Sequence, residues 1–289
     1  MTTTVPDRIA LIGGSGRLGR LVAARLAEDG TWPLRLLTRA PDAARAALGD
    51  RAEVVAGDIG DDAALAALLD GASRLFLLTP IAADLAVLQT RAINAAARAG
   101  VSRIVKLSGS DWTITNRHRS RAGEQHALVE ERLVEAPVAS VAIRPNAWMQ
   151  TGLAAQIAAW KAGGEGPPPE RDAPVASIDI RDIADVAVHA LTVPVVPAGP
   201  LVITGPEAVT WHAIRDRLPP RPTPAGVSAA PAHDLDPFHA AAVAEFRSLI
   251  AEGAASGVTR TVPGLLGRPA RDVWTWLREA YGAAPGPRE

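Results

Sequence analysis

One stretch decides the fold of this 289-residue chain: residues 9–20, IALIGGSGRLGR. An apolar run typical of a buried strand ends in three glycines spaced three apart, Gly13, Gly16 and Gly19, and apolar residues at helical spacing follow from 18 to 26. Glycines permit a tight turn and let the backbone approach a pyrophosphate, while the next helix offers free N–H groups and a positive dipole end. Strand, glycine turn and helix in this order predict a dinucleotide-binding site, which a Gly-rich surface turn would not explain.

The composition excludes several classes of protein. Hydrophobic residues make up 48% of the chain, and the net charge of −1 gives no electrostatic basis for binding nucleic acid or an anionic membrane. The absence of cysteine excludes disulfides, thiolate zinc sites and cysteine nucleophiles. No apolar run reaches the roughly 18–20 residues of a membrane span, and residues 1–6 lack the basic start of a signal peptide. We therefore expect a cytoplasmic monomer or homodimer that binds a small molecule and no nucleic acid, membrane or metal.

Short apolar strands alternate with helical patterns over the first half of the chain. Strands are expected at 34–38, 53–56, 75–78 and 103–107, after the first at 9–12, and a sixth ends near 144. Helices are expected to 28, from 41, from 61 or 62, and over 82–99, 120–135, 236–252 and 268–280. Short strand and helix candidates lie at 175–178, 183–191, 201–204 and 209–218. This alternation predicts an α/β fold, a Rossmann-type doubly wound parallel sheet. We expect a dinucleotide-binding domain over 1–146, its sheet completed by segments around 175–205, and a smaller, mostly helical substrate lobe over 147–289.

Candidate site residues follow from the rule that such sheets bind ligands at the carboxyl ends of their strands. The expected cofactor contacts are Gly13, Ser15, Gly16, Arg17, Leu18, Gly19, Arg39, Asp58, Ile59, Thr79, Pro80 and Lys106. The expected substrate contacts, after the fifth and sixth strands, are Ser110, Asp111, Trp112, Asn146, Trp148 and Met149. Two tryptophans suit a flat aromatic ligand, although core packing explains them equally well.

The end of the second strand favours NADP(H) over NAD(H). An NAD-binding fold usually has an Asp or Glu there, for the ribose 2′-hydroxyl. This chain has Arg39, and Arg17 lies inside the glycine turn. A guanidinium suits a 2′-phosphate, which a carboxylate would repel. The alternative is that both arginines are ordinary solvated side chains, and Asp58 is either an acceptor for the adenine amino group or simply an acid before a helix.

A series of short motifs runs in order along nearly the whole chain. They are GxxGxxG at 13–19, LTRAP at 37–41, GD at 57–58, FLLTP at 76–80, VKLS at 105–108, IRPN at 143–146, IDIRDIA at 178–184, ITGPE at 203–207 and LGRPAR at 266–271. The series resembles the NmrA-like group of atypical short-chain dehydrogenases, including its NADPH:quinone reductase-like members. The resemblance implies a Rossmann domain, a small C-terminal lobe and an active site in the cleft between them. It implies no substrate, because the group includes reductases, other biosynthetic enzymes and redox sensors.

The chain lacks the usual proton donor of short-chain dehydrogenases, a Tyr with a Lys four residues later. Its one tyrosine is Tyr281, and position 285 is Pro. The expected helix 120–135 instead carries His126 and Glu130, at places where the family pattern has an aligned His and Glu. They lie four residues apart on one helix face, so a carboxylate could orient an imidazole donor, with Ser108 the third candidate catalytic residue. Alternatively, His126 only packs beside the cofactor.

The missing acid favours one kind of reaction. Hydride addition to a simple ketone makes an alkoxide that needs a proton at once, whereas a quinone, enone or iminium gives a delocalised anion or a neutral product. We therefore expect an NADPH-dependent oxidoreductase acting on a conjugated small molecule. A non-catalytic NAD(P) sensor, or a redox-neutral isomerase or lyase, would use the same glycine turn.

Overall fold

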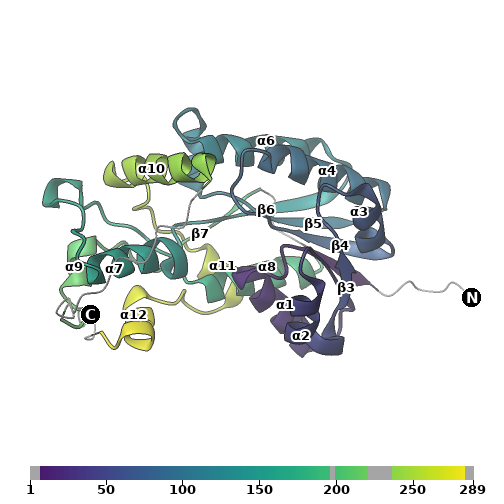
Figure 1. The fold of residues 1–289 in the computed structure, drawn as a ribbon, viewed down its shortest axis with the longest axis horizontal. Coiled ribbons are helices and arrows are strands. Elements are labelled where there is room, and N and C mark those ends of the chain that lie inside the picture. Colours follow the sequence, from purple (N-terminus) through teal and green to yellow (C-terminus); the bar gives the residue numbers. More distant parts are fainter. Residues whose placement is uncertain (1–6, 196–198, 221–235, 284–289) are drawn as a thin grey trace, which may run out of the picture. The chain divides into compact units, whose positions relative to one another are not determined.

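The structure, a computed structural model, describes residues 7–195, 199–220 and 236–283 (Figure 1). Its contacts divide the chain into two compact units, each built from separate segments. The first unit comprises the residues up to 109, 122–144 and 184–201. The second comprises 110–121, 145–183 and the residues from 202 onward.

A single parallel sheet forms the frame of the fold. The strands are β1 (Arg8–Ile12), β2 (Leu34–Thr38), β3 (Glu53–Ala56), β4 (Ala72–Leu77), β5 (Arg103–Leu107), β6 (Ala139–Pro145) and β7 (Leu201–Ile203). They lie in the order β3-β2-β1-β4-β5-β6-β7, and every pairing from β3 to β6 is parallel. The strand order reverses at β1, as in Rossmann-type sheets, so the predicted fold class is confirmed.

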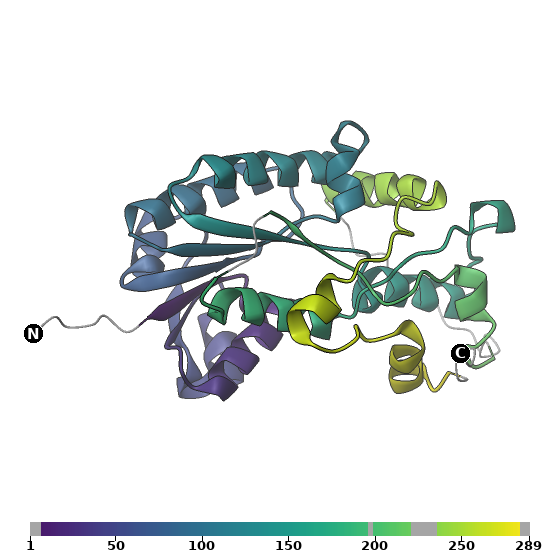
Figure 2. The same cartoon turned by 180° about the vertical axis from the view of Figure 1, so that it is seen from behind.

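Helices cover both faces of this sheet (Figures 1 and 2). One face carries α3 (Asp62–Leu69), α4 (Leu85–Arg98) and α6 (Arg121–Glu135), and the other carries α1 (Arg17–Asp29), α2 (Pro41–Leu48) and α8 (Ile180–Thr192). On the first face, Leu65, Ile93 and Val129 pack with strand residues such as Leu75 and Leu77 in one buried cluster. Burying both faces explains why the strands read as continuous apolar runs rather than alternating ones.

In the first half of the chain, two predicted boundaries differ from the structure by more than one residue. Strand β4 begins at Ala72 rather than Leu75, because parallel pairing on both sides extends it: Arg74 is opposite Ile9 of β1 and Arg103 of β5. Helix α4 begins at Leu85 rather than Ala82, after a turn in which the Leu85 N–H donates to the Ala82 carbonyl. Apolar content alone marked neither boundary.

Arginines of the first unit hold the late helix α8 in place. Arg25 of α1 pairs with Asp185 at 2.8 Å. At the carboxyl end of α8, Arg103 donates to the carbonyl oxygens of Val193 (2.5 Å) and Pro194 (2.8 Å), and Arg74 donates to that of Leu191. Positive side chains therefore satisfy carbonyls that a helix end leaves without partners.

The second unit is mostly helical. Its helices are α5 (Asp111–Thr115), α7 (Ala154–Lys161), α9 (Trp211–Arg215), α10 (Pro237–Ala251), α11 (Thr261–Leu266) and α12 (Val273–Tyr281), with 3-10 turns η2 (Arg117–Arg119) and η4 (Pro169–Arg171) and the π turn η3 (Met149–Leu153). One apolar cluster gathers side chains from the segments 149–157, 209–218 and 273–283. Asp236 caps α10 as predicted, whereas the last helix begins at Val273 and not Arg268, because the Asp272 carboxylate accepts from the Thr275 N–H at 2.7 Å and starts the helix there.

Within the described residues, no helix combines the length and apolarity needed to cross a membrane.

Candidate cofactor site and buried polar chain

The glycine turn between β1 and α1 is too tight for side chains at two positions. Gly13 has a φ of +82°, and a Cβ there would lie 2.3 Å from the Leu78 carbonyl oxygen. A Cβ on Gly19 would lie 2.1 Å from the Gly13 carbonyl oxygen. Gly16 is different: its φ is −74°, and a Cβ would meet the Gly13 oxygen at an ordinary 3.5 Å. The conformation of the turn therefore requires glycine at positions 13 and 19. It does not require glycine at position 16, where the reason must be a ligand that comes close to the backbone.

The amino end of α1 has no capping side chain. Its N-cap residue is Gly16, which cannot provide one. The N–H groups of the first turn have no acceptor within the helix, and the helix dipole is positive at this end. This is the arrangement in which Rossmann folds bind a pyrophosphate. The candidate residues Ser15 and Arg17 are exposed here, while Leu18 is buried and anchors the helix.

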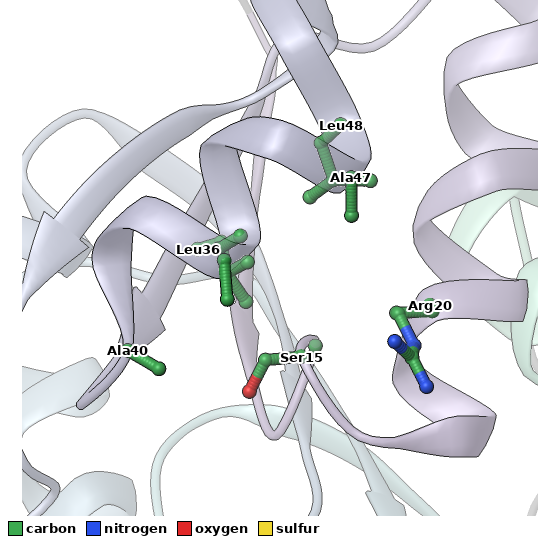
Figure 3. Close-up of a pocket in the computed structure, with 9 residues that line it drawn as sticks. Ser15, Arg20, Leu36, Ala40, Ala47 and Leu48 are labelled. Carbon is green, nitrogen blue, oxygen red and sulfur yellow. The ribbon is translucent and has the colours of Figure 1, made fainter.

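The end of β2 lies against the glycine turn. The Thr38 hydroxyl donates to the Ser15 hydroxyl at 3.3 Å and accepts from the Ala40 N–H at 3.1 Å. Beside this contact is a hollow of about 160 Å³, which Figure 3 shows between Ser15 and Arg20 on one side and Ala40 and Leu48 on the other. The hollow adjoins the expected position of the cofactor's adenosine half.

Arg39 is the exposed cation that follows β2. Its side chain is 81% exposed, and its Nε lies 3.7 Å from the Asp58 carboxylate, a loose pairing at the surface. Asp58 also accepts from the Gly60 N–H at 2.9 Å, so it shapes the turn after β3. An exposed pair of this kind stabilises the fold by less than about 1 kcal/mol, which leaves Arg39 free to turn towards an anion.

The remaining cofactor candidates stand at the ends of β3 and β4. Ile59 is buried, Thr79 is half-buried and Pro80 is exposed. The Thr79 hydroxyl accepts from the Gln89 side-chain nitrogen at 2.7 Å. Gln89 is fully buried on α4, and its side-chain oxygen has no partner within the described residues. Sequence reasoning missed Gln89, although a polar residue on the apolar face of a helix was a signal.

A chain of buried polar groups joins β5, α6 and β6. Lys106 belongs to β5 and Ser108 directly follows it, and both side chains reach His126 and Glu130 of α6. The Lys106 ammonium donates to the Ser108 hydroxyl at 2.8 Å and to His126 Nδ1 at 2.9 Å. The Ser108 hydroxyl donates to Glu130 at 2.5 Å, and Arg144 of β6 pairs with the same carboxylate at 2.5 Å. Four sequence candidates therefore meet in one network.

Burial sets the charges in this network. Burial lowers the pKa of Lys106 to about 7, with Glu130 opposing the shift and Arg144 adding to it. Burial, and then the charge of Lys106, lowers the pKa of His126 well below its ordinary value. The imidazole is therefore neutral near pH 7. Since Nδ1 accepts from Lys106, we assign its proton to Nε2.

The partner of Glu130 is not the one expected from the helix spacing. Among the hydrogen bonds of the described residues, none joins Glu130 to His126. Lys106 and Ser108 lie between them, and Arg144 takes the rest of the carboxylate. Arg144 lies in the IRPN motif but is not among the predicted site residues. Its position near the carboxyl end of β6 was the available signal.

Most substrate candidates pack within the second unit. Trp112 is buried, its Nε1 donates to the Asn146 side-chain oxygen at 2.8 Å, and its ring meets Phe246 edge-on at 5.7 Å. Met149 is fully buried, and Trp148 is half-buried beside Ile178. Ser110, the N-cap residue of α5, and Asp111 are half-buried. For Trp112 these contacts agree with the packing alternative.

The described residues contain no group of three or more His, Asp or Glu side chains arranged to hold a metal ion.

A parallel sheet of this order, with a glycine turn opening onto an uncapped helix, defines a Rossmann-type protein. The NmrA-like family model matches residues 6–205, and the chain belongs to that family. The predicted family is thereby confirmed.

Two curated relatives align over almost their whole length. The chain is 34% identical over 301 residues to (4-alkanoyl-5-oxo-2,5-dihydrofuran-3-yl)methyl phosphate reductase of Streptomyces griseus, with 94% of this chain and 97% of the relative covered. It is 29% identical over 288 residues to the NAD(P)H azoreductase of Xenophilus azovorans, covering 96% and 99%.

Solved structures share the fold at lower identity. The NADPH-dependent quinone oxidoreductase of Escherichia coli, complexed with NADPH, has a TM-score of 0.76 at 22% identity, covering 94% of this chain and 99% of that one. The triphenylmethane reductase of Citrobacter sp., complexed with NADP(H), has a TM-score of 0.75 at 18% identity, with the same coverage.

Proposed function

We propose that this protein is an NADPH-dependent oxidoreductase that transfers hydride to a conjugated small molecule, such as a quinone or an enone. The observation that carries the proposal is the Streptomyces relative, a reductase alignable end to end. The name of its substrate describes an unsaturated five-membered lactone whose double bond is conjugated with two carbonyl groups. This is the type of acceptor that the missing Tyr and Lys favour, because hydride addition gives a delocalised anion.

NADP(H) is the cofactor that the residues fit best. Gly16 and the uncapped end of α1 would receive the pyrophosphate, and a Cβ at Gly16 would stand in its way. Arg39, with Arg17 of the turn, would bind the 2′-phosphate. The proposed contacts further along are Asp58, Ile59, Thr79, Pro80 and Lys106. The bound cofactor supplies the hydride.

The proposed catalytic residues are His126, Ser108 and Glu130. Ser108 directly follows β5, and His126 and Glu130 belong to α6. In this fold, ligands bind at the carboxyl ends of the strands. The neutral His126 would donate a hydrogen bond from Nε2 to the developing anion. Ser108 and Glu130 would fix the groups around it. The segments 110–112 and 146–149 are the proposed substrate contacts.

The test is oxidation of NADPH by the purified protein across a panel of quinones, enones, imines, azo dyes and simple ketones. We expect turnover with the conjugated acceptors, and a lower kcat/KM with NADH than with NADPH. Faster reduction of simple ketones than of quinones or enones would overturn the proposed substrate class. Tight binding of NADPH with no turnover of any acceptor would instead favour a regulatory sensor. Cytoplasmic location and a monomeric or homodimeric state are further proposals.

A further inference from the structure

We propose that Lys106 is the proton source of this site, and that it delivers its proton through the imidazole of His126 to the anion formed by hydride transfer. This inference rests on the proposed reductase function. It assigns to a strand residue the donor role that the absent tyrosine has in other short-chain dehydrogenases.

The surroundings of Lys106 are unusual for a buried cation. Its side chain is fully buried, yet within the described part of the chain it has no direct carboxylate partner. Buried ammonium groups are normally paired with an acid. Here the nearest acid, Glu130, is separated from it by the Ser108 hydroxyl and is occupied by Arg144. The ammonium instead donates to a hydroxyl and a neutral imidazole. Neither of these acceptors stabilises the charged form of the lysine as a carboxylate would.

The choice of lysine at this position also matters. Only two of the 30 basic residues are lysines, Lys106 and Lys161, and the rest are arginines. A guanidinium does not release its proton near neutral pH, whereas a buried amine does. Lys161 lies over the ring of Tyr281 at 4.7 Å, and no hydrogen bond or ion pair of the described residues joins it to this network. Lys106, the cation that contacts His126, is therefore of the type that can release a proton near neutral pH.

The groups that face Lys106 set its titration. Ser108 directly follows the strand of Lys106, His126 and Glu130 come from α6, and Arg144 comes from β6. Burial and Arg144 favour the amine, Glu130 favours the ammonium, and the resulting pKa of Lys106 is about 7. Loss and recovery of the proton are therefore nearly balanced at neutral pH.

The relay balances in protons and charge. Hydride addition leaves a negative charge on the acceptor. The Nε2–H bond of His126 breaks as the acceptor gains its proton, and an N–H bond of Lys106 breaks as Nδ1–H forms. His126 stays neutral throughout, and Lys106 becomes a neutral amine. One proton taken up from the solvent then forms a new Nε2–H bond as Nδ1 returns its proton to Lys106, so each turnover consumes one solvent proton. Without Lys106, donation from the neutral imidazole would leave an imidazolate, which is far too basic to form easily.

Two features of His126 and Ser108 suit this relay. No described residue hydrogen-bonds to His126 Nε2, so that atom has no competing acceptor. The Ser108 hydroxyl donates its hydrogen bond to Glu130, which leaves the lone pairs of the hydroxyl oxygen to accept from Lys106. Ser108 and Glu130 are thus positioning residues that hold the ammonium against His126.

The first test reads the proton directly and needs no turnover. Because the chain has two lysines, protein made with ¹³C-labelled lysine gives two side-chain signals, and the Lys106→Met variant assigns them. We expect the Lys106 signal to titrate near pH 7. Titration of Lys106 near about 10.4, the ordinary value of a lysine, would overturn the relay whether or not the protein is a reductase.

The second test compares variants on an acceptor that the wild type reduces. Met matches the length of Lys without its charge, so Lys106→Met should fold and still bind NADPH, although Lys106 is also a proposed cofactor contact. At saturating NADPH its kcat should fall by about 100-fold or more, since a positioned general acid contributes about 10²–10⁴-fold. The wild-type kcat should fall as pH rises through about 7, and this inflection should vanish in the variant. Lys106→Arg keeps a cation but not the titration, and it should not restore the rate; Lys161→Met is the matched control.

An unchanged rate and pH profile in Lys106→Met, or full activity in Lys106→Arg, would overturn the proposal. An inactive wild type would count against the reductase function alone, because the labelling test would still decide the titration.

Discussion

Replacing Gly19 with Ala adds only one methyl group, but we expect it to destabilise the glycine turn substantially. The new Cβ would lie 2.1 Å from the Gly13 carbonyl oxygen and 2.5 Å from the Gly14 Cα, and both neighbours are backbone atoms that cannot rotate away. To restore ordinary contacts, α1 and the turn must separate by about 1 Å. Overpacking of this kind costs about 1–3 kcal/mol, and the better helix propensity of Ala returns up to about 1 kcal/mol. We expect a net loss of about 2 kcal/mol at the upper end of that range.

Thermal unfolding and NADPH binding together test this reasoning. A loss of about 2 kcal/mol corresponds to a Tm lower by about 4–8 °C in a protein of this size or slightly smaller, and NADPH binding should weaken in parallel. Gly16→Ala is the matched control: its Cβ has an ordinary 3.5 Å contact, so Tm should hardly change while NADPH binding weakens at least tenfold. A Gly19→Ala protein as stable as the wild type, with equal affinity for NADPH, would refute the argument from space.

Three further substitutions probe other parts of the structure. Arg39→Asp should weaken NADPH binding by roughly 10- to 100-fold and leave NADH binding unchanged or tighter, since a charge-assisted contact of about 1.5–3 kcal/mol is lost. Fluorescence titrations that show the variant with the same preference for NADPH over NADH as the wild type would contradict this role. Glu130→Gln should lower the free energy of unfolding by about 2–3 kcal/mol, because it leaves the 16%-exposed Arg144 side chain without its anion; an unchanged urea midpoint would exclude a structural role for the pair. Asp182→Asn should cost at least about 2 kcal/mol, because the fully buried Asp182 pairs with Arg268 and Arg271; its Tm should fall visibly in calorimetry, and a wild-type Tm would count against the pairing.

The sequence predicted those elements whose ends carry chemical signals. The strands 34–38, 53–56 and 103–107 match the structure because each is an apolar run closed by polar residues or glycine. Helix α3 begins after Asp61, whose carboxylate accepts from the Ala63 and Ala64 N–H groups as an N-cap should. The helices α5, α7 and α11 were not predicted. The two shortest, α5 and α11, have too few residues to show a periodicity, and α7 follows a π turn that breaks it.

The candidate site was predictable as a set of residues but not as a set of contacts. Strand ends and helix spacing indicated Lys106, Ser108, His126 and Glu130. Their pairing depends on how far α6 is shifted along β5, which no local pattern encodes. The spacing of Lys106 and Ser108, two residues apart, was the one usable signal. It indicates that the lysine faces the same helix as the serine, but the contact between Lys106 and His126 was not predicted.

The arginine contacts to α8 have a consequence for synthesis of the chain. Arg74 reaches a carbonyl 117 residues later, and Arg103 one that is 90 residues later. Val186 and Leu191, in the part of α8 that belongs to the first unit, are fully buried. A ribosome-bound chain that has reached residue 146 therefore has all six strands from β1 to β6 but still lacks one of its covering helices. Contacts so distant in sequence slow folding, and the exposed face invites aggregation or chaperone binding. The nascent protein should acquire protease resistance in one late step, after α8 leaves the exit tunnel, and a fragment ending at 146 should not acquire it at all.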